Sequence, residues 1–382
     1  MICVLVGTIG CAEVAEPLVQ TSIDLNTAMA GDTTGYDRAV NARDLVFPDD
    51  FGPHPTFKTE WWYFTGNVDD ETGRKFGYEL TIFRSALAPP ERDQAATEPS
   101  ENSEATSRWS SDQLYMAHFS LANIDGFNES GEPTFYSFER FGRGALGLAG
   151  SQAAPFRVWL DDWTMEGADG DLFPLRLQAM DDDIAIDLTL SSSKPIVLQG
   201  DRGLDQKGEG IGNASFYYSF TRLPTQGTIQ IGEQKVAVKG TSWKDHEWST
   251  SALGENQEGW DWFSLQLSDN REIMFYVLRE KDGSASTFTN GTLVNADGSY
   301  TPLKRDDVRL KVLDTWKSPH SGATYPSGWA FEVPAYNINL DIQPLMKDQE
   351  LNATVRYWEG AVSIRDKDGT TGRGYVELTG YR

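Results

Sequence analysis

The amino-acid sequence predicts an all-β protein, and three observations carry this prediction. Runs of β-branched and aromatic residues recur roughly every 8–12 residues, with Gly, Pro, Asn and Asp between them. Several runs alternate apolar and polar side chains with a period of two, which is typical of half-buried strands. No long segment shows helical periodicity. Many short strands favour sandwiches or barrels, and a length of 382 residues favours two domains.

Order is expected to begin near Leu45, and the first half then opens with two strands that form a hairpin. The strands at 61–68 and 76–83 are aromatic and β-branched, and the acidic turn at 69–73 joins them. In the second strand every other residue from Phe76 is apolar, so one of its faces is expected to be buried. Further strands are expected at 115–122, 135–138, 157–160, 175–179, 184–190 and 216–223.

The second half repeats this pattern, with tight turns at 268–271 and 295–298. The sequence therefore predicts two domains, at 43–240 and 241–382. The strands expected in or next to the second domain lie at 236–240, 262–267, 273–278, 288–294, 308–313, 329–333, 338–345, 353–358, 360–364 and 375–379.

The segment 1–42 is expected to be an export segment followed by a flexible arm. Its apolar start ends in Gly10-Cys11, where a bacterial lipoprotein would be cleaved and acylated, although a basic region is lacking. We therefore expect an exported protein, either a periplasmic or cell-envelope lipoprotein anchored at Cys11 or a secreted protein. A cytoplasmic protein with an apolar start is the alternative. Both cysteines, Cys3 and Cys11, lie in this segment, which excludes a disulfide in the folded body.

The composition limits the partners. The formal net charge is −24, so nucleic acid and anionic membrane surfaces are excluded as partners by repulsion. An acidic loop is expected at 89–107, because this stretch has nothing to bury.

The segment Trp243-Lys244-Asp245-His246-Glu247-Trp248 concentrates indole, acid and imidazole more than any other stretch. The chain has only four histidines, and histidine is the side chain that exchanges protons near neutral pH. In an extended strand His246 and Trp248 share one face, whereas Asp245 and Glu247 share the other. A carboxylate beside His246 would fix its tautomer. The alternative is a structural acid–base pair at a domain boundary.

Three more stretches carry candidate site residues. In the run Glu60-Trp61-Trp62-Tyr63, alternation puts Glu60 and Trp62 on one face of a strand and Tyr63 on the other. A second stretch holds His118, and a third is Gly259-Trp260-Asp261-Trp262-Phe263. For the first two, a buried structural role is the alternative. The histidines lack the spacing of metal ligands, so no metal is expected, and the Gly-x-Ser-x-Gly elbow of α/β-hydrolases is absent.

These stretches resemble the bacterial family that joins carotenoid 1,2-hydratases (hydroxyneurosporene synthases) with AttH-like secreted proteins, and the chain has the AttH-like form. The likeness extends from about residue 45 to the end. It runs through Phe47-Pro48, His54-Pro55, Thr59 to Tyr63, Thr65-Gly66, Met116 to His118, Val158-Trp159 with Trp163, Lys194 to Gly200, Ala214 to Ser219, Thr221 to Leu223, Gly240 to Trp243, Asp245 to Trp248, Gly259 to Ser264, Tyr357 to Gly360 and Gly374 to Tyr381.

The resemblance implies two lipocalin-like antiparallel β-barrels in one chain and a site where they meet. The hydratase members add water to an isoprenoid double bond without a cofactor. AttH-like members are described as hydrolases or as parts encoded beside an ABC-type transporter. The resemblance thus implies an apolar ligand, no cofactor and a transporter permease as a candidate partner.

Two functions stay open at this point. In the first, the protein is a hydratase or isomerase: His246, or Asp245 with a raised pKa, protonates an alkene, and Glu60 or Asp261 activates water. His246→Ala should then abolish turnover and spare binding. In the second, the protein is a ligand carrier, a transporter accessory or a hydrolase; a structural envelope protein fits the acidic and aromatic clusters less well. The ligand is expected to contact Trp62, Tyr63, His118, Trp248, Trp260 and Trp262, with Trp248 and Trp260 stabilising a carbocation.

Overall fold

The computed structural model describes residues 32–90, 111–168, 171–251, 253–254, 256–367, 369 and 371–382. The expected lipid attachment at Cys11 and most of the acidic loop at 89–107 lie outside these residues. The described part consists of β-strands with three short 3₁₀ helices, which confirms the all-β prediction. Among the described residues, no helix has the length and apolarity needed to span a membrane.

The first thirteen strands form one antiparallel sheet with the order β4-β3-β2-β1-β13-β12-β9-β8-β7-β6-β5, and β10 and β11 pair with β12. Its elements are η1 (Asp49–Phe51), β1 (Thr59–Asp70), β2 (Lys75–Ala86), β3 (Gln113–Asn123), β4 (Thr134–Arg143), β5 (Ala149–Gln152), β6 (Arg157–Leu160), β7 (Trp163–Gly167), β8 (Leu175–Asp181), β9 (Ile184–Leu190), β10 (Val197–Leu198), β11 (Leu204–Gln206), β12 (Ala214–Ile231) and β13 (Gln234–Ser249).

The remaining strands form a second antiparallel sheet with the order β17-β16-β15-β14-β25-β24-β22-β21-β18, a short β23 on β24, and a separate β19–β20 hairpin. Its elements are β14 (Gln257–Leu267), β15 (Glu272–Glu280), β16 (Asn290–Val294), β17 (Tyr300–Lys304), η2 (Arg305–Asp307), β18 (Arg309–Val312), β19 (Thr315–Lys317), β20 (Thr324–Pro326), β21 (Trp329–Val333), η3 (Pro334–Tyr336), β22 (Ile338–Pro344), β23 (Glu350–Leu351), β24 (Tyr357–Asp366) and β25 (Thr371–Leu378).

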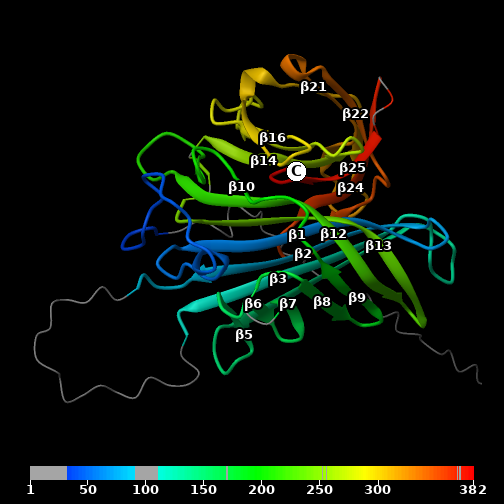
Figure 1. The fold of residues 1–382 in the computed structure, drawn as a ribbon, viewed down its shortest axis with the longest axis horizontal. Coiled ribbons are helices and arrows are strands. Elements are labelled where there is room, and N and C mark those ends of the chain that lie inside the picture. Colours follow the sequence, from blue (N-terminus) through cyan, green and yellow to red (C-terminus); the bar gives the residue numbers. More distant parts are fainter. Residues whose placement is uncertain are drawn as a thin grey trace, which may run out of the picture.

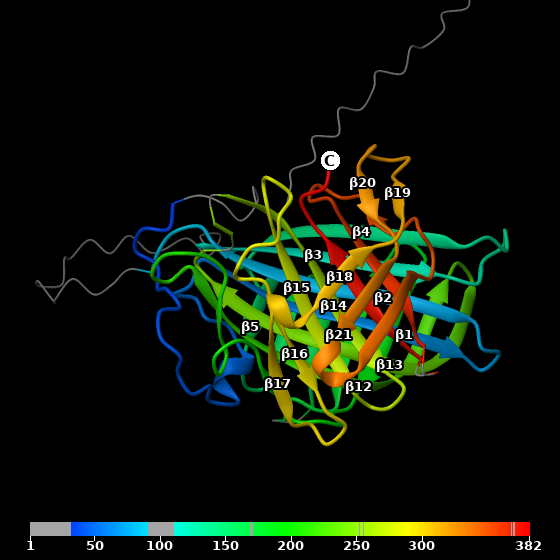
Figure 2. The ribbon, with the colours of Figure 1, turned by 90° about the horizontal axis from the view of Figure 1, so that it is seen from above.

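Each sheet curls around a core of its own, as the two lipocalin-like barrels implied by the resemblance would do. The first core holds Trp62, Phe119 and Trp163, and the second holds Phe263, Trp329 and Val376. Figures 1 and 2 show the second sheet, in yellow to red, lying across the central strands of the first. These central strands are β1, β12 and β13, the longest in the fold apart from β2, and β1 and β13 carry two of the segments singled out in the sequence, Glu60 to Tyr63 and Trp243 to Trp248.

The passage from the first sheet to the second comes after Ser249. Strand β13 pairs with β1 as far as Thr59↔Ser249 and also with β12, so it belongs to the first sheet throughout. The expected boundary at 240/241 falls inside this strand. In place of the strands expected at 353–358 and 360–364 there is one strand, β24, which begins only at Tyr357. Gly360 does not break it, because it leaves room for the Trp358 ring to lie over it.

The contact layer between the barrels is called the seam here. Gly77 of β2 marks how close the sheets come, since a Cβ there would lie 2.6 Å from the Cβ of Ala361 on β24. The seam is a third apolar cluster, formed by Tyr63, Tyr217 and Trp243 from the first sheet and Trp262, Met274, Tyr276, Leu278, Ala361 and Tyr375 from the second.

Candidate functional site

Strand β13 carries two different environments on its two faces. Its Cα partners on β1 place His246 opposite Trp62 and Asp245 opposite Tyr63. Alternation directs Trp62 and His246 into the first barrel, where their rings stack with centroids 4.8 Å apart. The same alternation directs Tyr63 and Asp245 to the seam. His246 and Asp245 thus lie on opposite faces of β13, as the sequence predicts. One face points into the first barrel and the other points to the seam.

A cavity lies at the seam, and both sheets contribute to its wall. Its volume is about 70 Å³, which is room for about two water molecules. The wall combines aromatic rings with three carboxyl groups and one ammonium group. The lining residues are Trp61, Tyr63, Phe83, Lys207, Tyr217, Asp245, Glu247, Leu253, Trp260, Trp262, Tyr276, Leu278, Tyr357 and Glu377.

Asp245 is the carboxyl group of the wall that β13 supplies. Tyr217 Oη donates to its Oδ2 at 2.7 Å, and Ser219 Oγ (2.5 Å) and Trp243 Nε1 (2.7 Å) donate to its Oδ1. Burial raises the pKa of Asp245 to about 6, against the lowering effect of these three donors, and the nearby Glu247 adds to the rise. Asp245 therefore exchanges its proton within the physiological pH range.

Glu247 lies two residues further along the same face, and Lys207 accompanies it. The Lys207 ammonium lies 3.2 Å from Glu247 and 2.7 Å from Asp205, and it sits 4.1 Å above the Tyr276 ring. Burial raises the pKa of Glu247, although Lys207 opposes the rise. This part of the wall shows that carboxylates and phenol rings at the seam accommodate an ammonium group.

The second sheet supplies Glu377, Trp260 and Trp262. Trp260 Nε1 donates to Glu377 Oε1 at 3.0 Å, and Trp262 Nε1 donates to Tyr217 Oη at 3.1 Å. Burial raises the pKa of Glu377 to about 8, and the negative charges of Asp245 and Glu247 contribute to the rise. Glu377 is therefore mostly protonated and neutral at pH 7.

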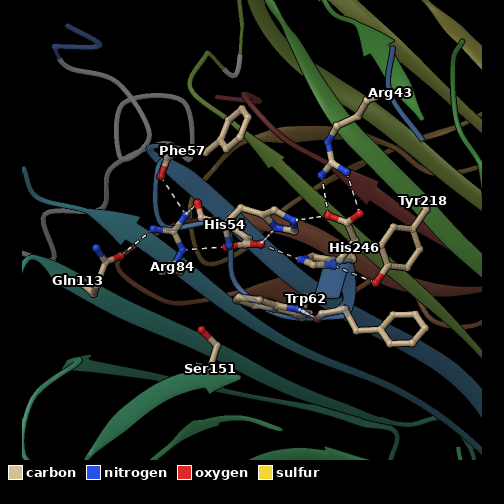
Figure 3. A network of polar contacts seen from close by, with 12 residues as sticks. Arg43, His54, Phe57, Trp62, Arg84, Gln113, Ser151, Tyr218 and His246 are labelled. Carbon is tan, nitrogen blue, oxygen red and sulfur yellow. Dashed lines mark hydrogen bonds and ion pairs between the residues drawn. The ribbon is translucent and has the colours of Figure 1, made fainter. Parts of the chain in front are cut away.

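On the other face of β13 lies a hydrogen-bonded network that includes His54, Arg84 and His246 (Figure 3). All three contact the Glu60 carboxylate. His54 Nδ1 lies 2.7 Å and His246 Nε2 lies 2.9 Å from Glu60 Oε1, while Arg84 donates to Oε2 at 2.8 Å. His246 Nδ1 lies 2.9 Å from Tyr218 Oη. Glu60 and His246 are both 0% exposed.

The charges in this network are fixed by its contacts. Burial lowers the pKa of His246 to about 3, so this ring is neutral. Burial opposes the charge on His54, but Glu60 and Asp50 outweigh it and raise the pKa of His54. Arg84 and His54 lower the pKa of Glu60 well below its usual range, although burial opposes them. The network therefore holds a carboxylate between two cations, and His246 has no proton to release at neutral pH.

The described residues bring one group of potential metal ligands together, namely His54, Glu60 and His246, with their ligand atoms within 4.8 Å of one another. Each of these atoms already takes part in a hydrogen bond, and Arg84 contacts the same carboxylate. A metal ion would add positive charge beside Arg84 and a charged His54. The group therefore fits a hydrogen-bonded network better than a metal centre.

The ten residues that the sequence singles out fall into four places. Asp245, Tyr63, Trp260 and Trp262 line the cavity. The structure places the other six elsewhere. Glu60, Trp62, His246 and Trp248 lie on the inner face of the first sheet, His118 lies behind the cavity wall, 2.7 Å from Tyr357 Oη, and Asp261 faces the second barrel, where it pairs with Arg279 at 2.9 Å.

Several wall residues are absent from the sequence-based candidates. Tyr217 lies between Phe216 and Tyr218 in the sequence. The alternation of a strand alone could have predicted that its side chain points to the opposite face from theirs. Glu377 alternates with Tyr375 on β25 and could have been found in the same way. Lys207 lies outside any strand, so no periodicity points to it.

Comparisons with known proteins show which proteins share this fold. A solved structure from Nitrosomonas europaea that carries the AttH designation is similar, with a TM-score of 0.76 and 32% identity over 91% of this chain and 100% of that one. Kievitone hydratase from Nectria haematococca shares the fold, with a TM-score of 0.65 and 15% identity over 90% and 98% of the two chains. No match was found among curated proteins. The model of the AttH-like family matches residues 38–381, so the chain belongs to the AttH-like family.

Proposed function

We propose that this protein binds a neutral or cationic, flat apolar molecule in the seam cavity and that Asp245 protonates a carbon–carbon double bond of that molecule. The observation that supports this most is the position of Asp245. It is a buried acid whose pKa is raised to about 6, and it lies in a wall made largely of aromatic rings. A general acid works best with a pKa near the working pH.

The chemistry that follows is a hydration. The double bond takes a proton from Asp245, a C–H bond forms, and the neighbouring carbon becomes a cation. The rings of Trp260 and Trp262 stabilise this cation, because aromatic faces attract positive charge. Water then adds to the cation and gives up one proton, and Asp245 regains a proton. Loss of a proton from a different carbon would instead give an isomerisation. A hydratase of the same fold, kievitone hydratase, agrees with this proposal.

The charge of the wall limits the ligand. Asp245, Glu247 and Glu377 face one lysine, and that lysine is already paired with Asp205 and Glu247. An anionic ligand such as a fatty acid would meet carboxyl groups and no free ammonium in this wall. We therefore propose an uncharged or positively charged ligand that places a flat group against this wall; a carotenoid is far longer than the cavity.

Three naphthalene probes of one shape test this selection: 2-naphthol, 2-naphthoate and 2-naphthylmethylammonium. Calorimetry should show binding of the neutral and cationic probes and at least tenfold weaker binding of the anionic one. Trp260→Leu should weaken binding, whereas Trp159→Leu, a half-buried tryptophan on β6 far from the wall, should not. Preferred binding of 2-naphthoate would contradict the proposal.

Catalysis is tested separately from binding. Molecules that co-purify with the protein are identified by mass spectrometry and incubated with it in water labelled with ¹⁸O. Uptake of label that Asp245→Asn abolishes supports a hydratase. If the bound molecules never take up label, the protein is better described as a non-catalytic ligand carrier. Export, attachment at Cys11 and a transporter permease as partner stay predictions of the sequence.

A further inference from the structure

Behind the cavity wall, a chain of three side chains leads from Tyr357 towards the surface. The Tyr357 ring lines the cavity, and its hydroxyl lies 2.7 Å from His118 Nδ1. His118 Nε2 lies 3.2 Å from Glu139 Oε1. His118 is 0% exposed, whereas the Glu139 side chain is 13% exposed.

This row of hydrogen-bonded side chains forms only when the two sheets are packed against each other. Tyr357 belongs to β24 of the second sheet, whereas His118 on β3 and Glu139 on β4 are Cα partners in the first. The backbone N–H of Thr354, just before β24, donates to Glu139 Oε2 at 3.0 Å and fixes this carboxylate from the opposite sheet. His118 is also held by an edge-to-face contact with Phe83, with centroids 5.4 Å apart.

The surroundings of His118 and Glu139 determine which atoms of the two side chains carry protons. Burial lowers the pKa of His118, so its ring is neutral and carries one N–H. Contacts with His118 and Thr354 lower the pKa of Glu139, although burial opposes them, so this group is a carboxylate that can only accept. His118 therefore donates from Nε2 to Glu139, and its Nδ1 accepts the Tyr357 hydroxyl proton.

We propose that Tyr357, His118 and Glu139 form a proton relay and that Tyr357 is the group that takes the proton from water in the seam cavity. The proton of Tyr357 passes to His118 Nδ1, and the electron pair of the O–H bond stays on the Tyr357 oxygen. Glu139 stabilises the resulting imidazolium. The Tyr357 oxygen takes a proton from the attacking water, whose oxygen forms the new bond to carbon. The relay then runs in reverse: His118 returns its Nδ1 proton to the Tyr357 oxygen, and the Tyr357 proton passes through cavity water to Asp245. The order of acceptor, imidazole and carboxylate is that of a catalytic triad.

The relay rests on the proposed function and adds a base to it. Burial raises the pKa of Tyr357 well above its usual range, and the nearby carboxyl groups of Glu79, Glu359, Glu377 and Glu139 raise it further wherever they are ionised. The phenol thus stays protonated at rest and gives up its proton only to His118. Asp245 as acid and Tyr357 as base then have opposite tasks in one cavity.

The tautomer of His118 tests the relay without any ligand. The chain has four histidines, so ¹⁵N-histidine labelling gives a spectrum in which His118→Gln identifies the His118 signals. We expect a neutral ring with the proton on Nε2 at neutral pH, because burial lowers the pKa of His118 below its usual value. Glu139→Gln should let the Nδ1–H form appear. Tyr115→Phe, which removes another hydroxyl from β3, should change nothing. A charged ring, or a proton on Nδ1 in the unchanged protein, would overturn the relay.

Proton transfer is tested with 2-naphthol, which becomes a strong acid when excited by light. In the unchanged protein the bound probe should emit as naphtholate, because the relay accepts its proton. Tyr357→Phe and Glu139→Gln should lose this emission while the Kd changes less than about threefold, and Tyr115→Phe should keep it.

The outcomes separate the relay from the proposed function. If Asp245→Asn removes the naphtholate emission and Tyr357→Phe keeps it, Asp245 takes the proton and the relay is overturned. If 2-naphthol does not bind at all, the proposed ligand class fails, and the tautomer of His118 still decides on the relay.

Discussion

Asp245 and His246 are neighbours in the chain but have opposite roles in the structure. Burial acts on both, raising the pKa of the carboxyl group to about 6 and lowering that of the imidazole to about 3. The neighbours decide what each group can then do. Asp245 faces a cavity, whereas His246 is held between Glu60 and Tyr218. The better proton donor near pH 7 is thus the aspartate.

The affinity for 2-naphthylmethylammonium should depend on the ionisation of Asp245. The carboxyl group is neutral below about pH 6 and negative above it, so affinity should rise about tenfold as pH passes upward through this value. Asp245→Asn should remove this rise and keep a second one near pH 8, where Glu377 ionises. Calorimetry at several pH values checks this, with the uncharged 2-naphthol as control. The same rise in both variants would exclude Asp245 as its source.

At the scale of elements, β1 and β13 are fixed to each other by the charged network under them. Glu60 receives contacts from His54, His246 and Arg84, which come from the segment before β1, from β13 and from β2. His54 also stacks on Trp248 of β13, with centroids 3.7 Å apart. We interpret the network as the support that keeps β13 in register, so that Asp245 points to the cavity.

Glu60→Gln should therefore destabilise the protein by about 3–5 kcal/mol, because it leaves Arg84 and a charged His54 buried without their carboxylate. Urea unfolding followed by tryptophan fluorescence measures this change. The matched control is Asp187→Asn, which breaks the exposed pair with Arg176 and should cost about 0–1 kcal/mol. His246→Ala is likewise expected to lower the free energy of unfolding, because it removes the contacts of His246 with Glu60 and Tyr218. Equal effects of Glu60→Gln and Asp187→Asn would contradict a supporting role for the network.

At the scale of the whole molecule, the seam is the least usual part, because it buries carboxyl groups between two barrels. Glu359 and Glu377 are Cα partners on β24 and β25, and Tyr63 of the first sheet donates to Glu359 at 2.7 Å. Burial raises the pKa of Glu79 and of Glu377 to about 8, and it raises that of Glu359 well above its usual range. At pH 7 these groups are mostly neutral, which lets the sheets pack.

Stability should fall as pH rises from about 4.5 to about 8. The folded state keeps protons on these glutamates that the unfolded state releases above its ordinary pKa of 4.5, so each rise in pH favours unfolding. Glu359→Gln should flatten this dependence, and Asp187→Asn should leave it unchanged. Urea midpoints at a series of pH values measure it. An equally steep dependence in Glu359→Gln would show that other groups are responsible.

Much of the fold could be predicted from the sequence. The alternation at 76–83 and 184–190 matches β2 and β9, since a period of two follows from strand geometry alone. The short strands β10, β11 and β23 could not be predicted, because a strand of two or three residues is too short to show an alternation of apolar and polar side chains. The boundary expected at 240/241 falls inside β13 for a related reason. Nothing local in β13 tells which sheet it joins, because this depends on its pairing with β1 and β12.

The sequence by itself determined the strands, the family and which residues share a face of β13. The tertiary structure alone decided which face meets the cavity, because that depends on which side of the first sheet the second barrel covers. It put Asp245, Trp260 and Trp262 into one wall and enclosed His246, Glu60 and Trp248 in the first barrel. It also decided the protonation of these groups, since burial and neighbours from distant strands, and not residue type, set their pKa values.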